Sequence, residues 1–103
     1  MDNALFSLSS FDAQEGRLVL AADGLDFDNT DAYLDALCQM IDARVFDKQI
    51  DADLHSWLVD FEGVRFMLRG EHYSASIWLE MLDAEGKEEL AFLHGWLRKR
   101  LSR

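Results

Sequence analysis

The sequence has no proline, a single cysteine and no long apolar run, and each of these absences narrows what the protein can be. Because Cys38 is alone, an internal disulfide is impossible, which favours a reducing, cytoplasmic compartment. No apolar run approaches the roughly 20 residues that a membrane-spanning helix needs. No basic residue precedes Arg17, so the N-terminal segment lacks the charged start of a secretory signal peptide. We therefore expect a cytoplasmic protein without a membrane anchor.

Repeats, low-complexity tracts and proline-rich linkers are also missing, so we expect residues 1–103 to form one domain. Half of the residues are apolar and 12% are aromatic. This composition argues against disorder. At this length a folded chain buries roughly 65% of the surface that the unfolded chain exposes, so the sequence can form a sizeable core.

Acidic side chains outnumber basic ones by 20 to 10, which gives a net charge of −10. The imbalance lies in the first 53 residues, which hold twelve acidic and three basic side chains. Because such a surface repels phosphate, we expect no nucleic-acid partner. The acidity is typical of bacterial cytosolic proteins, in which it favours solubility, and it would steer the protein towards basic partners.

Two neighbouring segments in the second half of the chain predict an antiparallel hairpin together with its register. Residues 57–61 and 64–68 alternate on either side of Glu62-Gly63, and a two-residue loop that contains glycine is typical of a tight β-turn. In this register Val59 lies opposite Phe66 on an apolar face, while the alternate positions share the other face. The pattern therefore predicts one buried side and one open side.

A second two-residue turn at Gly70-Glu71 would continue this sheet into a third strand over residues 73–82. The same alternation then sets Trp78 across from Gly63 and diagonal to Arg65. That position would allow a cation–π contact between the arginine and the indole. Together the three strands would form an antiparallel meander with one apolar face.

The rest of the chain predicts two more strands and two helices. Residues 5–9 and 17–21 have the short apolar patterns of a hairpin. An Asx cap and a hydrophobic staple within residues 27–31 predict a helix start. The apolar stripe of the first helix is formed by Leu34, Leu37, Cys38, Ile41 and Val45, and Arg44 and Lys48 lie at the C-terminal end of this helix. The apolar stripe of the second helix is formed by Leu90, Leu93, Leu97 and Leu101.

Antiparallel strands combined with two amphipathic helices indicate an α+β fold. We expect a two-layer sandwich, with a mainly antiparallel sheet of about five strands, two helices on one face and the element order ββαβββα. In this arrangement the helices cover the apolar face of the meander and leave the opposite face exposed.

The string Asp26-Phe27-Asp28-Asn29-Thr30 resembles, over about five residues, the Asp-x-Asp-x-Thr nucleophile motif of the haloacid-dehalogenase phosphotransferases. The resemblance implies an aspartate nucleophile, Mg²⁺ and a parallel sheet, whereas the meander predicts an antiparallel sheet and a helix cap accounts for the same residues. A related alternative is a small-molecule or divalent-cation-dependent enzyme that uses the Asp23–Asp31 loop, since clustered carboxylates suit hard cations. The candidate cation ligands are Asp23, Asp26, Asp28 and Asp31, and we predict no catalytic residue and no cofactor.

The exposed face of the meander is the strongest candidate for a binding surface. It combines a tryptophan, a methionine, a leucine and two arginines, a composition found at the centres of protein interfaces. Cross-strand pairing within the sheet, such as an Asp60–Arg65 ion pair, is the alternative explanation. We therefore expect a small non-enzymatic interaction protein, of adaptor, chaperone-like or inhibitor type, that binds a protein partner or a second copy of itself. The predicted partner-binding residues are Leu58, Arg65, Met67, Arg69 and Trp78.

Overall fold

The computed structural model describes residues 5–101 and consists of a six-stranded antiparallel sheet, two α-helices and one short 3-10 helix. Along the sheet the strands follow the order β1-β2-β6-β5-β4-β3. The elements are β1 (Ser7–Asp12), β2 (Arg17–Ala21), α1 (Thr30–Ile41), β3 (Arg44–Asp51), β4 (Leu54–Phe61), β5 (Val64–Glu71), β6 (Ser76–Met81), η1 (Ala84–Gly86) and α2 (Lys87–Leu101).

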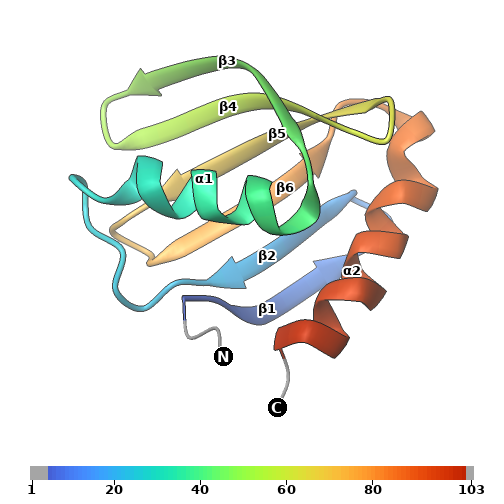
Figure 1. The fold of residues 1–103 in the computed structure, drawn as a ribbon, viewed down its shortest axis with the longest axis horizontal. Coiled ribbons are helices and arrows are strands. Elements are labelled where there is room, and N and C mark those ends of the chain that lie inside the picture. Colours follow the sequence, from blue (N-terminus) through green and yellow to red (C-terminus); the bar gives the residue numbers. More distant parts are fainter. Residues whose placement is uncertain (1–4, 102–103) are drawn as a thin grey trace.

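Both helices lie on one face of the sheet (Figure 1). The helix α1 connects β2 to β3 and packs against β4 and β5, whereas α2 packs against β1 and β2. The expected α+β class, with antiparallel strands and both helices on one face, is confirmed. The sheet has six strands in place of about five, so the element order is ββαββββα.

The additional strand is β3. We expected the first helix to continue through Val45, but α1 ends at Ile41, where Asp42 adopts a left-handed conformation with φ 61° and ψ 46°. The pairing of β3 with β4 is interrupted by a bulge at Phe46, and every side chain of β3 except Val45 is exposed, including Lys48. A bulged edge strand lacks a clear apolar period of two, so the sequence pattern did not reveal it.

The hairpin between β4 and β5 has the predicted register, with Val59 opposite Phe66. Its two turn residues both have positive φ angles, 55° at Glu62 and 86° at Gly63. A tight turn of type I′ requires positive φ at both positions, which explains why the two-residue loop at this point specifies the pairing.

The register predicted for β5 and β6 is wrong by six residues. Phe66 lies opposite Met81, and the connection is a four-residue loop, 72–75, in place of a tight turn beginning at Gly70. Gly70 belongs to β5, where α1 approaches it so closely that a Cβ would lie 3.0 Å from Thr30 Cγ2. A shift by an even number of residues leaves each side chain on its face, so the predicted division into a buried and an open side is unchanged.

The core lies between the sheet and the helices. Its members alternate along the strands and recur at helical spacing on α1 and α2, as the sequence predicts. Of the helices that the structure describes, none is long and apolar enough to cross a membrane. The fully buried side chains include Leu18, Leu20, Trp57, Phe66, Leu68, Ile77 and Leu79 from the sheet and Leu34, Leu37, Leu90, Leu93 and Leu97 from the helices.

Candidate functional site

The face of the sheet turned away from the helices has no covering element among residues 5–101, and we call it the open face. Strand pairing places its side chains in rows that cross all six strands. One row consists of Ser10, Val19, Trp78, Arg69, Ser56 and Gln49, and the next consists of Asp12, Arg17, Glu80, Met67, Leu58 and Asp47.

Trp78, Glu80 and Arg69 form a connected group in the middle of the open face. The indole Nε1 of Trp78 donates to Glu80 Oε1 over 2.8 Å, and Arg69 Nη1 lies 3.8 Å from the same oxygen. The Arg69 and Glu80 side chains are 31% and 25% exposed, so the group is partly dehydrated but accessible. Arg69 Nε is buried and has no hydrogen-bond partner in the part of the chain described. Its N–H group is therefore a donor that the described residues leave unsatisfied.

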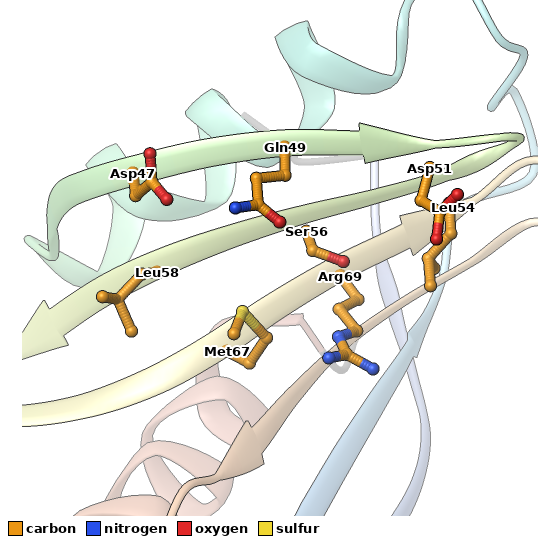
Figure 2. Close-up of a pocket in the computed structure, with 8 residues that line it drawn as sticks. All are labelled: Asp47, Gln49, Asp51, Leu54, Ser56, Leu58, Met67 and Arg69. Atoms are coloured by element: carbon orange, nitrogen blue, oxygen red, sulfur yellow. The ribbon is translucent and has the colours of Figure 1, made fainter.

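Two hollows lie on the open face, one on each side of Arg69. The first has a volume of about 390 Å³ and lies on β3, β4 and β5. Figure 2 shows its side chains standing on the side of these strands away from α1. Leu58 and Met67 provide apolar surface in this hollow, and Asp47 and Asp51 line it from the edge strand. The hollow thus combines an apolar surface with acidic side chains.

The second hollow, of about 400 Å³, lies over β2, β5 and β6. Val19 and Trp78 provide its apolar surface, while Arg17, Glu71 and Glu80 supply charges of both signs. Because Arg69 lines both hollows, its side chain separates two parts of one continuous surface.

Four of the five predicted binding residues are brought together on the open face: Leu58, Met67, Arg69 and Trp78. Trp78 lies opposite Arg69 and not, as expected, opposite Gly63, because β6 pairs with β5 in a different register. This correction moves the indole to the middle of the sheet, where it lines the second hollow.

Arg65 also points to the open face, nearer the β4–β5 turn, but its contacts differ from those expected. Its Cζ lies 4.4 Å from the centre of the Phe46 ring, so its cation–π contact is with β3 and not with Trp78. Asp60 lies opposite Arg65, yet its Oδ1 accepts the backbone N–H of Gly63 over 3.0 Å. The ion pairs within residues 5–101 do not include Asp60–Arg65.

Sequence reasoning missed the part of the open face that comes from β2. Arg17 and Val19 stand in the same rows as Met67 and Trp78 because β2 pairs with β6. The alternation of Arg17, Val19 and Ala21 was visible in the sequence, but no local signal places this strand beside β6. Of the residues that line the second hollow, the predicted binding residues therefore include Arg69 and Trp78 but not Arg17 or Val19.

The helix α1 begins where expected, but the hydrogen bonds in the loop before it differ from the expected cap. The helix starts at Thr30, yet the side chain of the preceding Asn29 does not cap it and instead donates to the Gly24 carbonyl over 2.9 Å. Thr30 Oγ1 donates to the Asp26 carbonyl over 2.6 Å. These bonds close the loop on itself and leave Phe27 44% exposed, where we expected it to pack as a staple.

The four aspartates considered as cation ligands are not gathered into one site. Asp26 and Asn29 exchange hydrogen bonds, since the side-chain Oδ1 of each accepts the backbone N–H of the other over 2.8 Å. Asp31 lies 3.0 Å from His55 Nδ1 on β4, and the other two aspartates are exposed. Within residues 5–101 no group of three or more histidine, cysteine or acidic side chains is arranged to hold a metal ion. Asp26 instead closes the turn before α1, and Asp31 joins α1 to β4.

Cys38 lies on the buried side of α1 and is 2% exposed. Burial, together with the nearby Asp35 carboxylate, raises the pKa of its thiol from 9.0 to about 11. Because the thiolate is the reactive form of cysteine, this thiol is protonated near neutral pH and is in its less reactive form.

Comparison with curated proteins and with solved structures finds no match to this chain. Comparison with protein-family models finds a match over residues 6–98 to the family described as "Protein of unknown function (DUF3630)". Since the matched segment includes most of the chain, the protein belongs to the DUF3630 family.

Proposed function

We propose that this protein is a non-enzymatic interaction protein, adaptor-like or chaperone-like, whose open face binds a helix of a partner protein. The observation that carries the proposal is the group of large apolar side chains in the middle of that face. Trp78, Met67 and Leu58 are neighbours there, and each is only partly buried. Aromatic and long apolar side chains of this kind supply much of the binding energy at protein interfaces.

The dimensions of the open face suit an α-helix laid across the strands. Six strands spaced about 4.8 Å apart span roughly 24 Å, which corresponds to a helix of about 16 residues. The two hollows, of about 390 and 400 Å³, lie along this direction on either side of Arg69. They would accept apolar side chains from one side of the helix, while Arg69 Nε would donate to a polar side chain between them.

The acidic side chains along the hollows favour a basic helix. Asp47 and Asp51 line the first hollow and Glu71 and Glu80 the second, on a protein whose net charge is −10. Lysine and arginine side chains on the flanks of the helix would complement these carboxylates and speed association at low salt. A second copy of this chain would instead bring the same acidic side chains together, so we favour a basic partner over a homodimer.

Titration with designed helical peptides tests this function. One peptide of about 16 residues would carry leucine on one face and lysine and arginine on the other, and its matched partner would carry glutamate in place of the basic residues. Isothermal titration calorimetry would give both affinities. We expect the basic peptide to bind at least roughly tenfold more tightly, and Met67→Glu to weaken its binding by at least roughly tenfold.

Phe92→Ala is the matched control, because Phe92 is 58% exposed on α2, on the helix-covered side of the sheet. It should leave peptide binding unchanged. Equal affinity for the two peptides, or equal weakening by Met67→Glu and Phe92→Ala, would refute a basic-helix site on the open face. Dimerisation of the free protein that Met67→Glu abolishes in analytical ultracentrifugation would assign the face to a second copy.

A further inference from the structure

A second cluster lies at the end of the sheet where the loop before α1 meets the β5–β6 connection, at the left in Figure 1. Phe27 comes from that loop, Asp31 from the first turn of α1, His55 from β4 and His72 from the β5–β6 connection. The centre of the Phe27 ring lies 5.4 Å from that of His55 and 6.2 Å from that of His72. One partly exposed aromatic ring therefore touches both imidazoles.

His55 has one ring nitrogen bonded and the other free. The residue is 3% exposed, and its Nδ1 lies 3.0 Å from Asp31 Oδ1. Because a carboxylate only accepts, a neutral imidazole donates its Nδ1–H to Asp31 and keeps a lone pair on Nε2. That Nε2 is buried and has no hydrogen-bond partner among the described residues. Buried polar atoms are nearly always satisfied, so this unpartnered imidazole nitrogen is available to accept a hydrogen bond or to bind a metal ion.

His72 has the same feature close by. Its Nδ1 is also buried without a hydrogen-bond partner in residues 5–101. His55 lies opposite Gly70, and His72 follows Gly70 by two residues, in the β5–β6 connection. Because both rings lie against Phe27, displacement of Phe27 and rotation of the two side chains would let both imidazoles reach one ion.

We propose that His55 and His72 bind one divalent transition-metal ion of the zinc class once Phe27 moves aside. Imidazole nitrogen suits zinc, nickel and copper, whereas calcium and magnesium prefer oxygen. Asp31, bonded to the second nitrogen of His55, holds the position of the carboxylates that orient metal-binding histidines. The described part of the chain holds no group of three or more such ligands, so two protein ligands would leave the remaining coordination positions to water. The site lies on the helix-covered side of the sheet, so it is independent of binding at the open face.

Zinc titration of the protein without an affinity tag tests the proposal. We expect calorimetry to show one zinc ion per chain, and NMR to show shifts of the imidazole resonances of His55 and His72 but not of His94. His72→Gln should weaken zinc binding by at least roughly tenfold, and Asp31→Asn by roughly 10–100-fold. Phe27→Ala should strengthen it, because the variant removes the ring that covers both imidazoles. Magnesium and calcium should not bind at the same concentrations.

Two controls separate this site from other zinc-binding groups. His94→Gln changes a histidine that stacks on Phe11 with a ring distance of 4.2 Å, away from the cluster. Asp23→Asn combined with Asp28→Asn removes exposed carboxylates of the acidic loop. The proposal is overturned if either control weakens zinc binding as much as His72→Gln does. It is also overturned if neither the wild-type protein nor Phe27→Ala binds zinc.

Discussion

The indole N–H of Trp78 donates to the carboxylate of Glu80, two residues further along the same strand, over 2.8 Å. Residues two apart in a strand point the same way, so both side chains stand on the open face. The carboxylate oxygen that accepts this bond also lies 3.8 Å from Arg69 Nη1. The tryptophan is therefore held in place in the free protein, which would reduce the conformational entropy lost in the partner binding that we propose.

We expect Trp78→Ala to destabilise the protein much less than Trp57→Ala. Trp57 is 1% exposed, and removing its side chain should cost about 3–5 kcal/mol of unfolding free energy. Trp78 is only partly buried, so its removal should cost less than roughly half of that amount. Urea unfolding of the two variants measures both changes. Equal losses would identify Trp78 as a structural residue and remove the central side chain of the proposed binding face.

Gly70→Ala should destabilise the protein, whereas Gly95→Ala should stabilise it. A Cβ on Gly70 would lie 3.0 Å from Thr30 Cγ2 and 3.2 Å from Leu34 Cδ2. Overpacking of this kind costs about 1–3 kcal/mol. A Cβ on Gly95 in α2 meets nothing within 4 Å, and alanine is better than glycine in a helix by about 0.5–1 kcal/mol. Thermal unfolding compares the two variants, and a higher melting temperature for Gly70→Ala would contradict the close packing of α1 on β5.

Glu62→Asn should stabilise the β4–β5 hairpin. Glu62 has a φ of 55°, in the left-handed region that glutamate adopts at a cost and asparagine adopts more readily. Asn-Gly is the preferred pair in such two-residue turns, so we expect a gain of roughly 0.5–1 kcal/mol in unfolding free energy. Glu62→Val is the opposing control and should destabilise, since a β-branched side chain disfavours positive φ. An asparagine variant no more stable than the valine variant would rule out this account of the turn.

The raised pKa of Cys38 should make stability fall at high pH. The folded protein holds the thiol proton more tightly than the unfolded chain does, since burial raises the pKa from 9.0 to about 11. The resulting contribution to stability is fully present below pH 9 and is lost as the pH rises towards about 11. Urea unfolding at a series of pH values should show a steeper decline for the wild type than for Cys38→Ala. Parallel declines would mean that other groups, common to both proteins, cause the whole effect.

The β4–β5 hairpin could be predicted in full because its determinants are local. The Glu62-Gly63 loop limits the turn to two residues, and the apolar alternation on both sides then leaves one register. The next register could not be predicted, because Gly70 is required for a contact with Thr30 of α1 and not for a turn. A glycine needed for space and a glycine needed for positive φ look the same in the sequence.

The sequence predicts which side chains of a single hairpin lie on the open face, but not which strands lie side by side across it. The period of two assigns Leu58, Met67 and Arg69 to the exposed side whatever the strand order. The position of Arg17 beside these residues follows from the pairing of β2 with β6, which brings strands from the two ends of the chain together. The edge strand β3 was hidden for a different reason, since a strand with side chains exposed on both faces has no apolar alternation to detect.

The pairing of β2 with β6 also has a consequence for the order in which the chain folds. Val19 pairs with Trp78, so forming this contact closes a loop of about 60 residues. Strands β3, β4 and β5 pair with their neighbours in sequence and can assemble first, whereas non-local pairing is slow. During synthesis the hairpin of β1 and β2 emerges first, but β2 cannot pair on its inner edge until β6, the last strand described, has been made. Until then the inner edge of β2 is unpaired, and an unpaired strand edge is a site at which a nascent chain can misassemble.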